Sequence, residues 1–209
     1  MRLISARGLS SVAVVLSALL LGACDRQGEG TQMMLTPAKT QFKNTDVTGL
    51  DYAKDFAIPD HNGKIRTLAD FKGKAVVIFF GYTQCPDVCP TTMSEMANVM
   101  QQLGPLADKV QVLFVTVDPE RDTPEMLSKY VPAFDPRFLG LVGDKAATEK
   151  IARDFRVFYQ KVPGKNPGSY TMDHTAGSYV FDPQGRIRLF VRHGQGAEPI
   201  AHDLKLLLS

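Results

Sequence analysis

The chain has 209 residues, of which 44% are hydrophobic and 22% charged, a balance that suits one globular domain with a sizeable core and some additional sequence. Its 24 Lys and Arg residues stand against 22 Asp and Glu residues, and no block of like charge occurs. A near-neutral chain without a basic face argues against nucleic-acid binding, because that function needs such a face to contact phosphates.

The N-terminus has the pattern of an export signal. Arg2 and Arg7 precede an uncharged apolar run of 13 residues at 9–21. This run is too short to span a bilayer comfortably, so it predicts a signal peptide over 1–23, with a short uncut signal anchor as the alternative.

The end of this run resembles the lipobox of bacterial lipoproteins. Residues 21–24 read Leu-Gly-Ala-Cys, and the resemblance implies cleavage after residue 23 and lipidation of Cys24, which would anchor the protein to the membrane. Asp25 is typical, among such lipoproteins, of retention at the periplasmic face of the bacterial inner membrane. Residues 24–50 are polar and unpatterned, which predicts a flexible membrane tether ahead of a domain over 51–209.

The domain alternates strand and helix patterns. We expect strands within 55–67 around a turn at 60–63, and at 75–80, 110–117, 138–142, 178–181 and 187–191. We expect helices at 91–103, 123–134, 146–159 and 198–208. In the third helix, Ile151, Phe155 and Phe158 share one face. This order predicts an α/β, thioredoxin-like fold with an N-terminal β-hairpin and a C-terminal β-hairpin plus helix.

Cys85 and Cys89 lie in the turn between the first buried strand and the following helix. Ligands bind at the carboxyl ends of strands in open α/β sheets, so this turn is a candidate site. Because Pro90 would clash inside a helix that began at Cys85, we expect the helix to begin at Pro90 with Cys89 as its N-cap. A helix N-terminus lowers a thiol pKa, whereas the charge of Asp87 raises it, and the sequence leaves this balance open.

Two cysteines at this spacing suit a soft metal or thiol redox chemistry. A disulfide between them would close a loop too small to stabilise the fold. Two thiolates are too few for an iron–sulfur cluster, and a closed zinc site needs four ligands. Copper and a redox-active disulfide between Cys85 and Cys89 remain as alternatives. Met93 and Met96 follow nearby, but their helical spacing with Ala97 and Met100 predicts core residues rather than ligands.

A third ligand has to come from one of four histidines. His61 lies in a polar turn, His202 in the terminal helix and His193 in a loop, all positions typical of surface side chains. His174 precedes the strand expected at 178–181, and in a thioredoxin-like sheet the segment entering this strand faces the cysteine turn. Spacing alone leaves His174 as either a ligand or an ordinary loop residue.

Three motifs together resemble the Sco/SenC family. They are Gly81-Tyr82-Thr83-Gln84-Cys85-Pro86-Asp87-Val88-Cys89-Pro90, Asp118-Pro119-Glu120-Arg121-Asp122-Thr123-Pro124 and Asp173-His174-Thr175, in the family's order. The resemblance implies a copper chaperone that helps to metallate the CuA centre of cytochrome c oxidase, with Cys85, Cys89 and His174 as ligands of Cu(I) or Cu(II). It implies as partners the CuA-bearing oxidase subunit, other copper chaperones and a thiol reductant.

Roles for the remaining motif residues stay open. Asp173 is either an orienting partner for the His174 imidazole or an ordinary turn residue. Residues 118–124 form a partner surface or a support for the cysteine loop, or else a turn with a helix cap.

An enzyme, a thiol–disulfide oxidoreductase, is the alternative function. Ordinary thioredoxin-like reductases have two residues between their cysteines and a proline before the strand near residue 178. Here three residues intervene and Ala176-Gly177 precede that strand, which favours metal binding.

Overall fold

The computed structural model describes residues 41–209. The predicted signal peptide at 1–23, the predicted lipidation site Cys24 and the tether up to residue 40 lie outside the described residues. Within 41–209, no helix is both long enough and apolar enough to cross a membrane.

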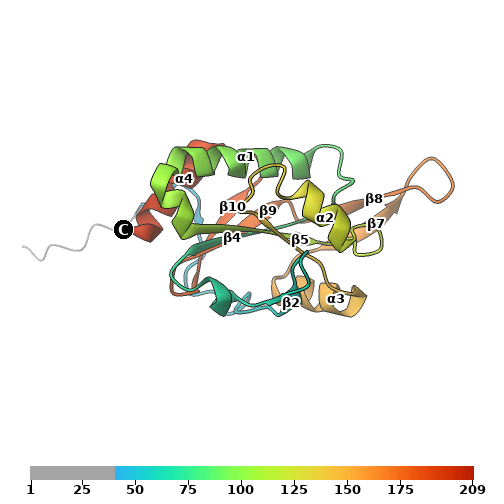
Figure 1. Ribbon diagram of the computed structural model, residues 1–209, viewed down its shortest axis with the longest axis horizontal. Helices are drawn as coiled ribbons and strands as arrows, with labels where there is room; N and C mark the ends of the chain where they lie inside the picture. Colours follow the sequence, from blue (N-terminus) through green and yellow to red (C-terminus); the bar gives the residue numbers. More distant parts are fainter. Residues whose placement is uncertain (1–40) are drawn as a thin grey trace, which may run out of the picture. The chain divides into compact units, whose positions relative to one another are not determined.

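A six-stranded sheet forms the centre of the domain (Figure 1). Its strands, in spatial order, are β1 (Thr45–Asp46), β10 (Ile187–Arg192), β9 (Gly177–Phe181), β4 (Ala75–Gly81), β5 (Val110–Thr116) and β6 (Leu139–Leu141). β4, β5 and β6 are parallel, whereas β9 runs antiparallel to β4. Every residue of β4 and β5 is buried, as predicted for continuous apolar strands that are covered on both faces.

Helices cover both faces of this sheet. They are α1 (Val88–Leu103), α2 (Pro124–Tyr130), α3 (Lys145–Asp154) and α4 (Ala197–Leu208), with short 3-10 helices at Leu68–Phe71 and Gly104–Lys109. α1 and α2 connect successive parallel strands, and right-handed crossovers place both on the face where Figure 1 also shows α4. Met93 and Met96 of α1 are buried in the core, as their spacing predicted.

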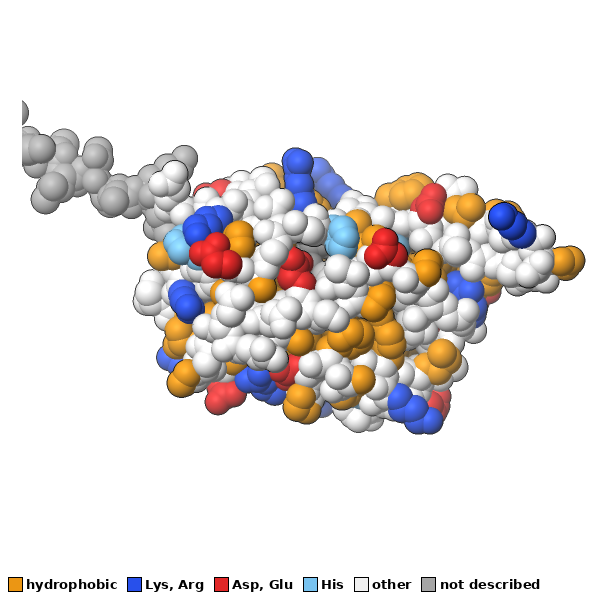
Figure 2. Space-filling model, turned by 90° about the horizontal axis from the view of Figure 1, so that it is seen from above, with side chains coloured by type: hydrophobic (Ala, Val, Ile, Leu, Met, Phe, Trp, Pro, Cys, Tyr) orange, Lys and Arg blue, Asp and Glu red, His pale blue; other side chains and the backbone are white. Residues whose placement is uncertain are grey.

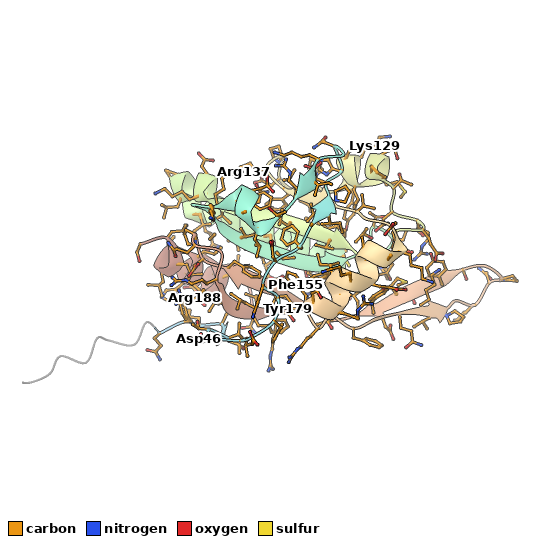
Figure 3. The ribbon with its side chains drawn as sticks, turned by 90° about the horizontal axis from the view of Figure 1, so that it is seen from below. Asp46, Lys129, Arg137, Phe155, Tyr179 and Arg188 are labelled. Atoms are coloured by element: carbon orange, nitrogen blue, oxygen red, sulfur yellow. The ribbon has the colours of Figure 1, made fainter. Side chains whose placement is uncertain are left out.

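α3 lies on the opposite face of the sheet, where aromatic side chains fill the space beneath β9. The rings of Phe155 and Tyr179 have centroids 5.7 Å apart, and the Tyr179 hydroxyl donates to the Phe155 carbonyl oxygen at 2.7 Å (Figure 3). The element order is the predicted thioredoxin-like one, with β2 (Ile58–Pro59) and β3 (Ile65–Arg66) as the N-terminal hairpin and with β9, β10 and α4 at the C-terminus.

A further hairpin, made of β7 (Tyr159–Pro163) and β8 (Tyr170–His174), was not predicted. It stands outside the central sheet and projects from one end of the domain (Figure 1). The helix expected to reach residue 159 ends at Asp154, because Arg156 adopts a left-handed φ of 53° through which a helix cannot continue. Phe158 therefore does not share the buried face of Ile151 and Phe155, and 58% of its surface is exposed.

The packed domain begins before the predicted boundary at residue 51. β1 lies within the segment 24–50 that was expected as a tether, and it pairs with β10. Lys43 and Asn44 lie just before β1. Their backbone N–H groups and the Asn44 side-chain amide donate hydrogen bonds to the buried carboxylate of Asp203. Residues 43–46 therefore belong to the domain.

The face of the domain seen in Figure 2 carries acidic and basic side chains interspersed with one another. This mixture is what a composition with nearly equal numbers of acids and bases indicates.

Candidate metal centre

The cysteine loop, residues 82–87, runs from the end of β4 to the start of α1. α1 begins at Val88 with Asp87 as its N-cap, two residues before the predicted start at Pro90. Pro90 is accommodated because it lies in the first turn, where a backbone N–H has no partner within the helix. Cys89 therefore occupies the first turn rather than the cap, and its backbone N–H donates to Cys85 Sγ at 3.4 Å.

The two cysteines differ in burial. Neither forms a disulfide, and Cys89 is fully buried whereas Cys85 is half-buried. Burial raises the pKa of the Cys89 thiol well above its usual range, and the nearby Cys85 and Asp122 raise it further. The sequence left open whether the pKa of Cys89 is raised or lowered, and burial has the largest effect on it. This thiol therefore keeps its proton at neutral pH in the metal-free protein.

His174 is the last residue of β8, and its ring faces the cysteine loop. Its Nε2 lies 3.5 Å from Cys89 Sγ, and its Nδ1 lies 3.1 Å from the Thr175 carbonyl oxygen. Because a carbonyl oxygen only accepts, we assign the ring proton to Nδ1, so that Nε2 presents its lone pair to the sulfur. The rings of Phe79 and Tyr82 contact the imidazole at steep angles, and burial lowers the pKa of His174, which favours the neutral form.

Asp173 does not take the orienting role that the sequence offered for it. Its side chain is exposed, and the hydrogen bond of His174 Nδ1 goes to the carbonyl oxygen of Thr175. The charge of Asp173 raises the pKa of His174, but the effect of burial is larger and opposite.

Three potential ligand atoms converge at this edge of the sheet. One atom each from Cys85, Cys89 and His174 lies within 4.8 Å of the other two, and this is the one group of three such residues found within 41–209. Two sulfurs and a neutral imidazole nitrogen form a soft donor set, which suits copper or zinc better than calcium or magnesium.

The other three histidines have partners elsewhere in the fold. The Gly140 N–H donates to His61 Nδ1 at 3.0 Å, His193 Nδ1 lies 3.0 Å from Thr92 Oγ1, and His202 Nδ1 lies 2.8 Å from an Asp203 carboxylate oxygen. His174 is therefore the histidine that the fold brings to Cys85 and Cys89.

Gly81 allows the close packing beneath the cysteine sulfur, and this role was not predicted from the sequence. A Cβ at this position would lie 2.9 Å from Cys89 Sγ, 2.8 Å from Phe79 Cε1 and 3.0 Å from Phe114 Cε2. The end of β4 therefore has no room for a side chain. In the sequence, the available signal is a glycine that ends an apolar strand, which often marks a close approach of other groups.

Residues 118–124, which follow the neighbouring strand β5, contact the cysteine loop. The buried Asp122 carboxylate accepts hydrogen bonds from the Thr83 N–H at 3.0 Å, the Thr83 hydroxyl at 2.6 Å and the Thr116 hydroxyl at 2.6 Å. Thr123 caps α2 by accepting from the Met126 N–H at 3.3 Å. The support and the helix cap, which the sequence presented as alternatives, both occur.

Comparisons with known proteins agree with this fold. The family model SCO1/SenC matches residues 45–209. The mitochondrial SCO2 homolog of Bos taurus is 38% identical over 153 residues, which cover 72% of this chain and 58% of that protein. The chain thus spans less than two thirds of the length of this curated relative.

Two solved structures are similar over most of the domain. ScoI of Bradyrhizobium japonicum with copper bound is 47% identical, with a TM-score of 0.68, and the match covers 74% of this chain and 98% of that one. Apo Sco1 of Thermus thermophilus is 40% identical, with a TM-score of 0.72, and the match covers 82% of this chain and 99% of that one.

Proposed function

This chain belongs to the SCO1/SenC family, and we propose that it binds a copper ion through Cys85 Sγ, Cys89 Sγ and His174 Nε2. The observation that carries this proposal is the convergence of the three ligand atoms within 4.8 Å. The bound copper in ScoI of Bradyrhizobium japonicum, which is 47% identical, supports it.

The donor set favours copper over the other soft metals. Structural zinc takes four protein ligands, and the group within 41–209 supplies three. Cu(I) accepts low coordination numbers and prefers thiolate ligands, which Cys85 and Cys89 provide once copper displaces their protons. Cu(II) needs a more nearly tetragonal arrangement, in which the imidazole is one donor and further ligands complete the sphere.

The copper ion is cargo in this proposal, and the protein delivers it to the CuA-bearing subunit of cytochrome c oxidase. Cys85 is half-buried in a loop at the edge of the domain, so a ligand of the recipient can approach the ion and exchange with it. Another copper chaperone supplies the ion, and a thiol reductant keeps the two cysteines reduced, because a Cys85–Cys89 disulfide has no thiolate to offer. A lipid anchor at Cys24 places the domain at the periplasmic face of the inner membrane.

Copper titration of the reduced protein tests the ligand assignment. Using residues 25–209, we expect Cys85→Ser, Cys89→Ser and His174→Ala each to weaken copper binding by at least about tenfold, or about 1.4 kcal/mol. His193→Ala, which changes a histidine bound to Thr92, serves as the control and leaves the affinity unchanged. A wild-type protein that binds no copper, or a His174→Ala variant that binds it equally well, would show that the assignment is wrong.

Delivery is tested separately. Copper-loaded protein is mixed with the copper-free, reduced CuA domain of an oxidase subunit, the two are separated, and the copper in each is measured. Delivery predicts movement of copper to the oxidase domain, and retention by this protein would contradict it.

A thiol–disulfide oxidoreductase is the second candidate, and the unequal burial of the two cysteines favours it. The half-buried Cys85 would attack a disulfide of the target, and Cys89 would then resolve the mixed disulfide. Two electrons and two protons pass to the target as Cys85 and Cys89 form their own disulfide. Turnover of a model disulfide by the His174→Ala variant discriminates the two functions, because preserved activity there would indicate thiol chemistry that is separate from metal binding.

A further inference from the structure

The ligand His174 stands on an element that is not part of the central sheet. It ends β8, and within 41–209 β8 pairs with no strand other than β7, in a two-stranded hairpin. A two-stranded hairpin is marginally stable by itself in water, so contacts with other elements have to fix its position. The cysteine loop and the hairpin are far apart in the chain. The side-chain contacts that connect them in the fold therefore determine the distance between His174 and the cysteines.

Arg121 makes such a connection. Its Nε donates to the Asp118 carboxylate, and its Nη1 donates to the Tyr170 carbonyl oxygen at 2.9 Å and to Gln84 Oε1 at 3.2 Å. Its guanidinium carbon lies 3.6 Å from the centroid of the Tyr170 ring and 5.7 Å from that of Tyr82. One side chain thus contacts both the cysteine loop, through Gln84 and Tyr82, and the first residue of β8.

Two further interactions join residues 118–120 to the β7–β8 hairpin. The Tyr170 hydroxyl donates to the Asp118 carboxylate at 2.9 Å, and Asp118 is almost fully buried. The ammonium group of Lys161 lies 4.6 Å from the centroid of the Tyr170 ring and pairs with Glu120. The Tyr170 ring is thus flanked by two cations, each of which attracts its electron-rich face.

Tyr82 extends this chain of contacts to the ligand. Its ring contacts the His174 ring with centroids 6.0 Å apart at an angle of 89°, and it also lies beneath the Arg121 guanidinium. Tyr170 and His174 are four residues apart on one strand, so they face the same side, and the strand carries a shift at one position to the other.

We propose that Arg121 is a positioning residue that fixes the β7–β8 hairpin against the cysteine loop and thereby keeps His174 Nε2 within reach of the Cys89 sulfur. This proposal rests on the proposed copper function, in which His174 is a ligand. The hydrogen bonds and ring contacts of Arg121 go to Asp118, Gln84, Tyr170 and Tyr82 and not to the three proposed ligands, and the proposal assigns its effect on copper binding to the position of His174.

A double-mutant cycle tests this route. Arg121→Lys keeps the charge but loses the planar, multiply bonded guanidinium. We expect this change to weaken copper binding by about tenfold in the otherwise unchanged protein, or about 1.4 kcal/mol. In the His174→Ala background the same change should have no further effect, because the ligand that Arg121 positions is gone. Equal losses in the two backgrounds would overturn the proposal.

Arg137→Lys is the matched control. Arg137, like Arg121, donates more than one side-chain hydrogen bond, and two of them go to the Asp135 carboxylate at 2.8 and 2.6 Å. Arg137→Lys therefore tests the loss of a hydrogen-bonded guanidinium elsewhere in the fold. We expect this variant to bind copper as the wild type does. A loss equal to that of Arg121→Lys would show a general effect of destabilisation and would contradict the proposal.

A readout without copper separates this proposal from the proposed function. In the reduced, metal-free protein, NMR contacts between the ring protons of His174 and Tyr82 report the position of the ligand. Arg121→Lys should weaken these contacts and Arg137→Lys should preserve them, even if the wild type fails to bind copper. Unchanged contacts in Arg121→Lys would overturn the positioning role.

Discussion

The substitution Gly81→Ala tests the packing on which the metal centre depends. The new methyl group would lie 2.9 Å from Cys89 Sγ, whereas ordinary van der Waals contact begins at 3.4 Å. The sulfur would have to move by about 0.5 Å, since the rings of Phe79 and Phe114 crowd the other sides at 2.8 and 3.0 Å and are fully buried.

Two quantities should change together. Overpacking in a dense core costs about 1–3 kcal/mol of folding stability, which chemical denaturation of the reduced protein measures as a lower midpoint. Metal–ligand distances tolerate shifts of only about 0.2 Å, so a sulfur displaced by about 0.5 Å should also weaken copper binding, by about tenfold. Competition titration against a chelator of known copper affinity measures this loss.

Gly140→Ala is the matched control. A Cβ there would lie 3.0 Å from Leu127 Cβ and 3.2 Å from both His61 Nδ1 and Val131 Cγ2, which is somewhat milder crowding away from the cysteines. We expect destabilisation with unchanged copper affinity. The reasoning is refuted if Gly81→Ala is as stable and binds copper as tightly as the wild type, or if both variants lose affinity equally.

Three further results are expected. Because burial raises the pKa of Cys89, copper must displace the proton of this thiol, so apparent copper affinity should rise by at least about tenfold per pH unit between pH 6 and 8, and a proton displaced from Cys85 steepens the rise. A pH-independent affinity would contradict this. His61→Ala removes a hydrogen-bond acceptor from a backbone N–H and should cost about 1–3 kcal/mol in denaturant unfolding while copper affinity stays constant, whereas His174→Ala should lower that affinity. Protein trimmed to 51–209 loses the donors of residues 43 and 44 to the buried Asp203 carboxylate, which keeps His202, and should unfold about 3 kcal/mol more easily than 41–209. Equal unfolding midpoints would refute the early domain start.

The parts of the fold that the sequence predicted are those with a local pattern. β4 and β5 are continuous apolar runs with every residue buried, and such runs predict buried strands without any information about neighbouring elements. Cys85 and Cys89 follow from their place between the first of these strands and α1. The start of that helix was predicted two residues late, because Pro90 was placed at the first helical position although it is equally tolerated as the third residue, still within the first turn.

The parts that it missed depend on contacts between distant segments. β7 shows no alternation of buried and exposed residues that would identify a strand, and β8 is mostly exposed or half-buried. β1 has two exposed residues and is a strand only because β10 pairs with it. Arg121 stood in a recognised motif, but its role needs Tyr170, which lies 49 residues later in the chain.

The position of the imidazole also bears on the choice between metal binding and thiol exchange. In thiol exchange, a base is useful beside the attacking thiol, which has to be the accessible one, and that is Cys85. The structure instead directs His174 Nε2 to within 3.5 Å of Cys89 Sγ, the fully buried sulfur whose raised pKa makes it a poor nucleophile. A neutral nitrogen placed against the buried sulfur does not activate Cys85 for the first attack on a target disulfide, although it can accept the Cys89 proton when Cys89 resolves the mixed disulfide. It does complete a three-atom donor set, because a metal ion replaces the thiol proton and draws both groups to itself. The orientation of His174 therefore fits copper binding directly, whereas in thiol exchange it serves the resolving step at Cys89 and leaves the first attack by Cys85 without a base from His174.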